Sequence, residues 1–265
     1  MFLSDYEKKI SKEFLNNGYI VKKSKNLKAL HKIRELLIIQ LKKDLKIKNK
    51  VNNENLLNNI HKYINLKDLN KIRLNLIDKV SSTTKFKKLY YDASKEYIDI
   101  LLGNELVMQK SLGLSIQLPK DDSSILPIHS DVWSGVSPFD IVVWIPLVDC
   151  YKTKTMFILP PKQNQMFLKD FGKMNKLNSK QIFNKVKSQL KWINIKFGEI
   201  MIFNQHLPHG NTVNIEKETR WSLNCRFKNI FSPYTDKKVG EFFEPITLRA
   251  CSKLALKYNL PKLEK

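Results

Sequence analysis

The sequence predicts a mainly β fold with helices (α+β), in which a helical layer packs on a β sandwich or barrel. Two observations lead to this expectation. Through most of the first hundred residues, apolar side chains recur every three to four positions, the spacing of amphipathic helices. After Gly103 they occur instead in short runs rich in Ile, Val, Phe and Trp, separated by Pro and Gly, which is typical of strands.

The helical pattern is clearest over 27–45, where apolar residues form a single stripe. The residues of this stripe are Leu27, Leu30, Ile33, Leu37, Leu41 and Leu45. Further helices are predicted over 4–17, 54–62, 66–80 and 86–102, the last of them ended by Gly103. We therefore expect residues 1–104 to form a mostly helical N-terminal layer.

The strand pattern occupies residues 105–232, which we expect to form the β core of the fold. The predicted strands are 106–109, 112–118, 126–132, 140–148, 154–159, 192–196, 199–203, 207–213 and 219–229, with one helix over 179–190 between them. Residues 233–265 lose the strand pattern, and a closing helix is predicted over 247–258. No Gly/Ser-rich linker and no internal repeat divides the chain, so residues 1–265 are expected to be one domain.

The chain is strongly basic, because 47 Lys and Arg against 25 Asp and Glu give a formal net charge of +22. The excess is spread over the whole sequence, and no stretch interleaves basic residues with stacking aromatics as single-strand binders do. We attribute the charge to a compositional bias toward Lys, Asn and Ile. Nucleic-acid binding is the disfavoured alternative and would show as a salt-sensitive affinity.

Several other classes of protein are excluded or disfavoured by short motifs. The longest uncharged apolar run, 141–148, is too short to span a bilayer. The three cysteines, at 150, 225 and 251, form no CxxC pair, which argues against a disulfide framework and favours a cytoplasmic protein. Neither GxGxxG nor GxxxxGK[ST] occurs, so a dinucleotide-binding fold and a P-loop are not expected.

A metal site is suggested by His129 and Asp131, which are separated by one residue in the predicted strand 126–132. With a period of two, both side chains leave the same face of the strand. A second imidazole from a distant strand would complete the two-histidine, one-carboxylate set of non-haem Fe(II) oxygenases. An HxD pair alone is weak evidence, because such pairs are common in exposed loops.

The second imidazole is expected from the segment 197–211, which contains both His206 and His209. His209 is preferred because Gly210 follows it and Arg220 comes eleven residues later, with Ser222 two residues beyond. His206 is left as a substrate contact or a solvated loop residue.

This order of residues resembles the phytanoyl-CoA hydroxylase-like branch of the 2-oxoglutarate and Fe(II)-dependent oxygenases. In that branch an HxD, a distal His-Gly after a Gly-Asp/Glu strand and a following Arg occur in sequence. Within that branch, the segments 129–135 and 144–154 are similar to the bacterial sporadic carbohydrate cluster oxygenases, which belong to gene clusters for surface carbohydrates. The resemblance covers about 105–230. It implies a double-stranded β-helix (jelly roll) and a dioxygenase that uses O₂ and decarboxylates 2-oxoglutarate to succinate.

The resemblance also implies roles for individual residues. His129, Asp131 and His209 correspond to the iron ligands, and Arg220 to the partner of the distal carboxylate of 2-oxoglutarate. Arg suits that role because its planar guanidinium binds a carboxylate bidentately. The further candidates for binding the cosubstrate are Ser222, Gln117, Trp144 and Asn211. Asn211 stands where the family often has Ser.

Alternation along 219–229 predicts which side chains share the cavity. Arg220, Ser222, Asn224 and Arg226 would line it, whereas Trp221, Leu223, Cys225 and Phe227 would pack on the other side. The candidate substrate contacts are Trp133, His206 and Arg226. Trp133 fits a core aromatic equally well, and Arg226 a structural salt bridge.

The resemblance implies a small, carbohydrate-type substrate, and the basic surface would suit a phosphorylated or nucleotide-linked one. The main alternative is a metal-binding, cupin-like isomerase or sugar-binding module without oxygenase activity. Arg220 favours the oxygenase over that alternative. Asp131 disfavours a halogenase, which would leave the carboxylate position to chloride.

Overall fold

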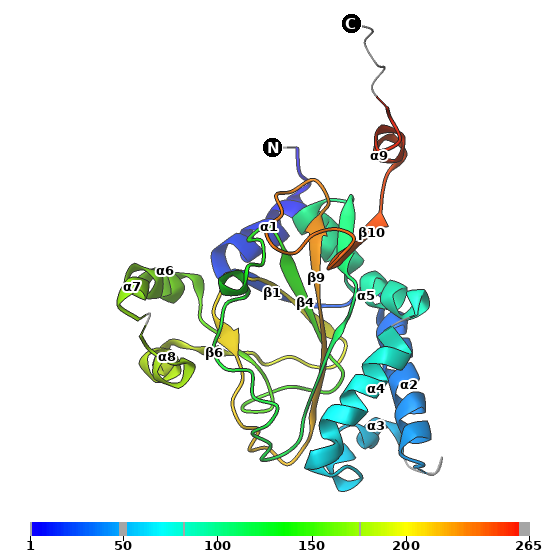
Figure 1. Ribbon diagram of the computed structural model, residues 1–265, viewed down its shortest axis with the longest axis vertical. Helices are drawn as coiled ribbons and strands as arrows, with labels where there is room; N and C mark the ends of the chain where they lie inside the picture. The colour runs from blue at the N-terminus through cyan, green and yellow to red at the C-terminus, as the bar shows by residue number, and fades with distance from the viewer. Residues whose placement is uncertain (1, 48–51, 82, 175, 260–265) are drawn as a thin grey trace, which may run out of the picture.

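The computed structural model describes residues 2–47, 52–81, 83–174 and 176–259, which form helices and two antiparallel sheets (Figure 1). The helices are α1 Asp5–Asn17, α2 Leu27–Asp44, α3 Asn53–Leu56, α4 Leu69–Ser81, α5 Thr84–Leu102, α6 Pro161–Lys169, α7 Phe171–Met174, α8 Ser179–Val186 and α9 Ala250–Ala255. The strands are β1 Tyr19–Lys23, β2 Leu106–Gln109, β3 Gly113–Gln117, β4 Ile141–Pro146, β5 Phe157–Ile158, β6 Lys191–Trp192, β7 Glu199–Asn204, β8 His209–Gly210, β9 Arg220–Asn229 and β10 Phe243–Thr247. The expectation of a mixed fold, with helices first and strands after them, is confirmed.

The larger sheet has the strand order β1-β7-β4-β9-β2-β10, with β3 also paired to β9. The smaller sheet has the order β6-β5-β8. β9 lies at the centre of the larger sheet because β4, β2 and β3 all pair with it in antiparallel register. A side chain on β9 is therefore held by neighbouring strands on both edges.

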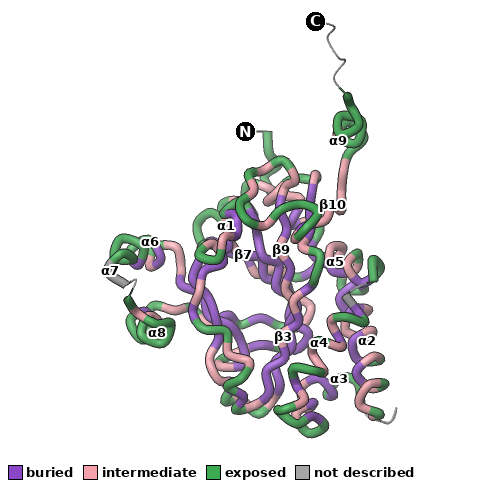
Figure 2. Tube along the Cα trace, in the orientation of Figure 1, coloured by how far each residue is buried: buried purple, intermediate pink, exposed green. Residues whose placement is uncertain are grey.

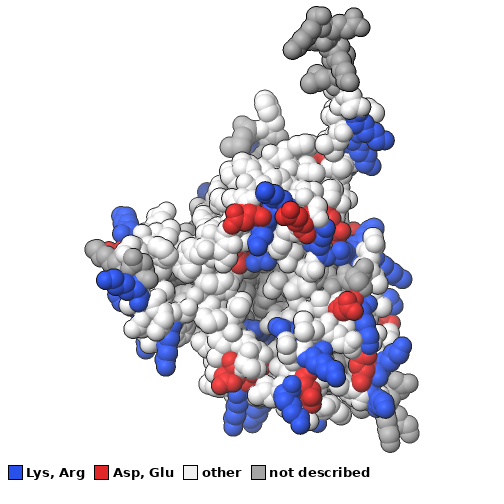
Figure 3. Space-filling view, in the orientation of Figure 1, with Lys and Arg blue, Asp and Glu red and all other residues white. Residues whose placement is uncertain are grey.

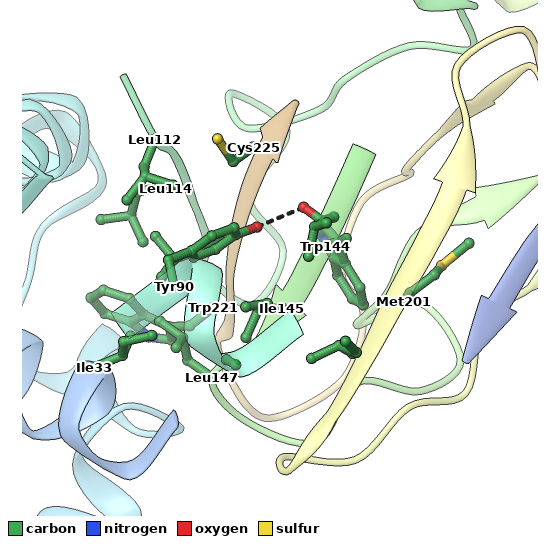
Figure 4. Packing of buried hydrophobic residues seen from close by; sticks show 14 of the residues in the cluster. Ile33, Tyr90, Leu112, Leu114, Trp144, Ile145, Leu147, Met201, Trp221 and Cys225 are labelled. Atoms are coloured by element: carbon green, nitrogen blue, oxygen red, sulfur yellow. Dashed lines mark hydrogen bonds between the residues drawn. The ribbon is translucent and has the colours of Figure 1, made fainter. Parts of the chain in front are cut away.

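The main core lies between the larger sheet and the helices α2, α4 and α5. One face of β9 contributes Trp221, Leu223, Cys225 and Phe227, each no more than 2% exposed. Tyr90 of α5 inserts among these residues, and its hydroxyl donates a hydrogen bond of 2.6 Å to the carbonyl of Val143 (Figure 4). In Figure 2 the purple of buried residues runs along the strands and the inner sides of these helices.

The predicted helices 4–17, 27–45, 66–80 and 86–102 are confirmed as α1, α2, α4 and α5. The segment 54–62 is not one helix, because α3 is followed by a separate 3₁₀ turn at Ile60–Lys62. This segment contacts the beginning of β9: the indole nitrogen of Trp221 donates to the carbonyl of Leu57 at 2.8 Å, and the amide of Thr219 donates to the carbonyl of Asn58 at 2.8 Å. The helical layer thus fixes the strand that carries Arg220.

The mostly helical N-terminal layer also contains a strand, β1, which the sequence analysis did not predict. Gly18 ends α1 in the left-handed region (φ 71°), and Tyr19–Lys23 then pair with β7 as an edge of the larger sheet. The segment is too short to show a strand period, and it becomes a strand because β7 offers a free edge.

None of the helices in the described part of the chain has the length and apolar character that a membrane span requires.

The prediction for the C-terminal tail is also wrong. Residues 243–247 form β10, which pairs with β2 at the other edge of the larger sheet. The predicted closing helix 247–258 is reduced to α9, which extends away from the body and has no buried residue (Figure 1). Its apolar residues Leu254 and Leu256 are 73% and 65% exposed, so α9 closes no core.

Between β5 and β6 the chain forms α6 and α7, which the sequence analysis missed, before the expected helix α8. Pro161 occupies the first turn of α6, where a missing N–H costs no hydrogen bond. The predicted strands 154–159 and 207–213 contain β5 and β8, which are shorter, with two residues each, whereas β6 shares only Trp192 with the predicted strand 192–196.

Lys and Arg side chains are scattered over the visible face of the molecule, with Asp and Glu between them (Figure 3). This distribution agrees with a compositional origin of the net charge.

Candidate metal and carboxylate site

His129, Asp131 and His209 lie close together, although residues 126–132 do not form the strand that was predicted for them. Their candidate ligand atoms all lie within 4.8 Å of one another. An isolated bridge pairs the two histidines: the amide of His129 donates to the carbonyl of His209 at 2.9 Å, and the reverse bond is 2.8 Å. Asp131 then begins a 3₁₀ helix, Asp131–Ser134, which turns its carboxylate toward the imidazoles. A turn, not strand alternation, therefore aligns the HxD pair.

Both imidazoles present Nε2 to the same point. Nδ1 of His129 lies 2.8 Å from the carbonyl oxygen of Pro127, and Nδ1 of His209 lies 2.9 Å from that of Leu207. A carbonyl oxygen can only accept, so each Nδ1 carries the proton and each Nε2 keeps its lone pair for a metal. Burial and the neighbouring His129 lower the pKa of His209 to about 4, which keeps its imidazole neutral at pH 7.

Asp131 supplies the negative charge of the group. Its Oδ1 lies 3.8 Å from Nε2 of His129 and accepts a hydrogen bond of 2.8 Å from Arg226. Two imidazoles and one carboxylate fit a divalent transition metal and leave coordination positions open. His206 is not part of this group, and its side chain is exposed.

The three residues lie at a cavity of about 110 Å³. Arg220, Ser222, Asn224 and Arg226 of β9 line it, which confirms the predicted alternation along this strand. Its other lining residues are Ser115, Leu126, Val142, Trp144, Met156, Phe203, Gly210 and Asn211. β9 thus supplies both of the arginines that line the cavity, and the paired strand β4 adds the apolar side chains of Val142 and Trp144 beside them.

Arg220 lies in this cavity without an acidic partner. It is 4% exposed, and its guanidinium donates to Oγ of Ser115 at 2.8 Å and to the carbonyl of Thr155 at 3.2 Å. Among the residues that the structure describes, no carboxylate lies within 4.0 Å of it, and its Nε has no partner. Burial lowers the pKa of Arg220 to about 10, so the group stays charged at pH 7.

Two residues that line the cavity have a buried polar atom without a partner in the described structure, namely Nε of Arg220 and the hydroxyl oxygen of Ser222. The hydroxyl of Thr155 is also buried without a partner there, but Thr155 does not line the cavity. Because buried polar groups are nearly always hydrogen-bonded, the unpartnered atoms of Arg220 and Ser222 call for a ligand. The donors and the charge together fit a carboxylate or another small anion.

The remaining candidates for cosubstrate binding divide into two kinds. Trp144 and Asn211 line the cavity. Gln117 lies behind Asn211: its Oε1 accepts from Nδ2 of Asn211 at 3.1 Å, and its Nε2 donates to the carbonyl of Thr212 at 2.8 Å. In the structure Gln117 therefore orients Asn211 and is not itself a lining residue.

Trp133 lies outside the residues that line the cavity and is 37% exposed. Its ring packs on Phe167 of α6 and Phe171 of α7, with centroid distances of 6.0 and 5.2 Å.

Four residues around the site were missed by sequence reasoning. Ser115 and Thr155 contact Arg220, and Gln109 and Gln205 contact Arg226. Ser115 could have been found, because it lies two residues before Gln117 on one strand and pairs with Ser222. The other three follow no local pattern.

No protein-family model and no curated protein matches this sequence. Solved structures do match. The nickel complex of the non-heme monooxygenase ThoJ has a TM-score of 0.58 at 12% identity and covers 92% of this chain and 85% of its own. Apo ThoJ has a TM-score of 0.56 at 12% identity, over 93% and 92% of the two chains. SnoN, a non-heme α-ketoglutarate-dependent epimerase from nogalamycin biosynthesis, has a TM-score of 0.49 at 12% identity, over 89% and 85%.

The chain therefore has the fold of the ThoJ monooxygenase structures. Since the match covers nine-tenths of the chain, it includes the helical N-terminal region as well as the strands.

Proposed function

We propose that this protein is an Fe(II)- and 2-oxoglutarate-dependent oxygenase. The observation that carries the proposal is the buried Arg220, which has no acidic partner in the described structure and lies in the same cavity as His129, Asp131 and His209. A binding module needs only the metal ligands. A second, cationic anchor within one cavity is what a cosubstrate with two separated carboxylates requires.

Each side chain has a distinct role in this proposal. The Nε2 atoms of the two histidines and one oxygen of Asp131 hold the iron. Arg220 binds the distal carboxylate of 2-oxoglutarate, while Ser222 donates its unpartnered hydroxyl. When bound, iron and 2-oxoglutarate supply the oxidising chemistry, in which O₂ oxidises a C–H bond of the substrate and 2-oxoglutarate yields succinate and CO₂.

The apolar wall of the cavity supports the same function. Val142 and Trp144 of β4 lie beside Arg226 and Asn224 of the paired strand β9, and Phe203 of β7 and Met156 complete the apolar lining. They exclude water, which strengthens the attraction between Arg220 and a carboxylate.

The fold assignment can be made finer in the same direction. We propose that the two antiparallel sheets form a double-stranded β-helix within a single domain, and that the chain belongs to the phytanoyl-CoA hydroxylase-like branch. The order of HxD, distal His-Gly and Arg supports this branch. The same resemblance supports a small, carbohydrate-type metabolite as substrate.

Cofactor binding can be tested without knowing the substrate. Anaerobic addition of Fe(II) and 2-oxoglutarate should produce a visible charge-transfer band, and addition of air should release labelled CO₂ from 2-oxoglutarate. His129→Ala, Asp131→Ala and His209→Ala should each abolish metal binding. His206→Ala is the matched control and should retain it.

Two results would contradict the proposal. Metal binding without any affinity for 2-oxoglutarate would favour the cupin-like alternative. Metal binding lost in His206→Ala but retained in His209→Ala would reverse the choice of the distal ligand.

A further inference from the structure

Arg226 contacts the carboxylate of Asp131 directly. Its Nη2 donates to Oδ1 of Asp131 at 2.8 Å. Its Nε donates to Oε1 of Gln205 at 2.9 Å, and its Nη1 donates to Oε1 of Gln109 at 3.1 Å. The guanidinium is therefore fixed in its plane by two glutamines, from the loop after β7 and from β2, before it meets the carboxylate.

Gln205 also holds the backbone at Asp131. Its carbonyl oxygen accepts from the amide of Asp131 at 3.2 Å and from the hydroxyl of Ser130 at 2.9 Å. Gln205 is fully buried, so water does not compete for these bonds. One residue thus fixes the main chain of Asp131 and, through Arg226, its side chain.

This arrangement restrains the orientation of the Asp131 carboxylate. Its Oδ1 accepts from Arg226 and is also the oxygen that lies 3.8 Å from Nε2 of His129, whereas Oδ2 makes no hydrogen bond to any residue that the structure describes. The terminal torsion of an aspartate is otherwise broad, so an unrestrained carboxylate could turn and offer either or both oxygens to a metal. A guanidinium on Oδ1 selects one orientation, in which this oxygen stays close to His129.

We propose that Arg226 is a positioning residue that holds the carboxylate of Asp131 in one orientation for binding the metal, with Gln205 and Gln109 fixing the guanidinium. The inference rests on the metal site of the proposed function. It assigns Arg226 a role different from the substrate contact expected from the sequence, because three of its five N–H donors are engaged within the protein.

Electrostatics and positioning predict opposite results for the loss of Arg226. Its positive charge repels a cation bound beside Asp131, so a purely electrostatic effect would make metal binding tighter when the charge is removed. A positioning role predicts weaker binding. Partners of metal ligands typically contribute about 10- to 100-fold in metal affinity.

The test is Mn(II) binding by Arg226→Gln and Arg226→Lys, measured by equilibrium dialysis without 2-oxoglutarate. We expect both variants to bind Mn(II) about 10- to 100-fold more weakly than the wild type. Arg226→Lys retains the charge but cannot donate to all three partners. Weaker Mn(II) binding by this variant would therefore show that the shape of the guanidinium matters. The visible spectrum of the Co(II)-loaded proteins should change as well, because it reports the coordination of the ion.

Arg249→Gln is the matched control, since Arg249 is exposed near α9 and its side chain is remote from the cavity. It removes the same charge and should bind Mn(II) like the wild type. Circular dichroism of the metal-free proteins checks that each variant folds. If Arg226→Gln does not fold, the Mn(II) measurement on Arg226→Lys tests the proposal.

The outcomes separate this inference from the proposed function. A wild-type protein that binds no Mn(II) would remove the metal site itself. Unchanged or tighter binding by folded Arg226 variants, with an unaltered Co(II) spectrum, would overturn only the positioning role.

Discussion

β9 carries a buried cation near each end, and the two differ in their surroundings. Lys228 is fully buried and finds three acceptors for its three N–H groups: Oδ1 of Asp140 at 2.9 Å, Oγ of Ser137 at 2.9 Å and the carbonyl of Pro233. Arg220, at the first position of the strand, is 4% exposed and has two neutral acceptors and, among the described residues, no carboxylate.

Under the proposed function, the comparison separates a cation that has a carboxylate partner within the protein from one that is left for a ligand. Lys228 has a carboxylate partner in Oδ1 of Asp140, whose Oδ2 has no partner in the described structure, and the pair links β9 to the segment before β4. Arg220 keeps a desolvated charge that the folded protein does not neutralise, and burial accordingly lowers its pKa to about 10. The free-energy cost of burying such an unpaired charge is typical of sites where a bound ligand offsets it.

The largest effect is expected from breaking the Lys228–Asp140 pair. Lys228→Met leaves the carboxylate of Asp140 buried and unpaired, which should lower the free energy of unfolding by about 3–5 kcal/mol. Chemical denaturation of the metal-free protein measures this loss.

The double variant Lys228→Met/Asp140→Leu is the control, because an apolar pair of similar volume often replaces a buried ion pair with little loss. It should recover most of the stability. A double variant no more stable than Lys228→Met would mean that Lys228 acts through its other contacts.

Replacing Arg220 is expected to weaken ligand binding and not the stability of the fold. The Arg220→Met variant should bind 2-oxoglutarate about 10- to 150-fold more weakly, since a hydrogen bond to a charged group contributes about 1.5–3 kcal/mol. Its free energy of unfolding should remain the same or rise. The charged guanidinium disfavours folding, because its pKa in the folded protein, about 10, lies below the ordinary 12.5.

Calorimetry with Mn(II) present gives the affinity for 2-oxoglutarate, and thermal unfolding gives the stability. Saturating 2-oxoglutarate should raise the melting temperature of the wild type but not that of the variant. Equal rises in melting temperature in the wild type and in Arg220→Met would mean that the distal carboxylate of 2-oxoglutarate does not bind at Arg220.

The smallest effect is expected from Ser222, whose buried hydroxyl has no partner in the described structure. Ser222→Ala should weaken 2-oxoglutarate binding by about 2- to 10-fold, as the loss of one hydrogen bond of about 0.5–1.5 kcal/mol would. Ser94→Ala is the matched control, since the hydroxyl of Ser94 is buried in α5 and donates to the carbonyl of Tyr90. A loss of 2-oxoglutarate affinity in Ser94→Ala as large as that in Ser222→Ala would deny Ser222 a direct role.

The parts of the site that sequence reasoning predicted all follow from short-range rules. Alternation along β9 placed Arg220 and Ser222 on one face, and Trp221 in the core, because strand side chains repeat every two residues. The grouping of His129, Asp131 and His209 followed from chemical type and order along the chain. The prediction of a strand over 126–132 failed, because a 3₁₀ turn can align two side chains as well as a strand does.

By itself, the sequence determined the amphipathic helices α2 and α5, the alternation of β9 and the residues that could bind a metal and a carboxylate. The helices and the alternation depend on neighbours a few positions away along the chain, whereas the grouping of His129 with His209 came from residue type and the family resemblance. Only the tertiary structure decided that 19–23 and 243–247 become edge strands, because a strand exists through its pairing with a distant partner.

The tertiary structure likewise decided the environment of each charge. Arg226 meets Asp131 across 95 positions of the sequence, and Gln109 meets Arg226 across 117. Nothing in the local pattern distinguishes Arg226, which has a carboxylate partner, from Arg220, which has none among the described residues. Whether a buried cation is neutralised depends on which distant side chains the fold brings within hydrogen-bonding distance, and that is set by packing of the whole chain.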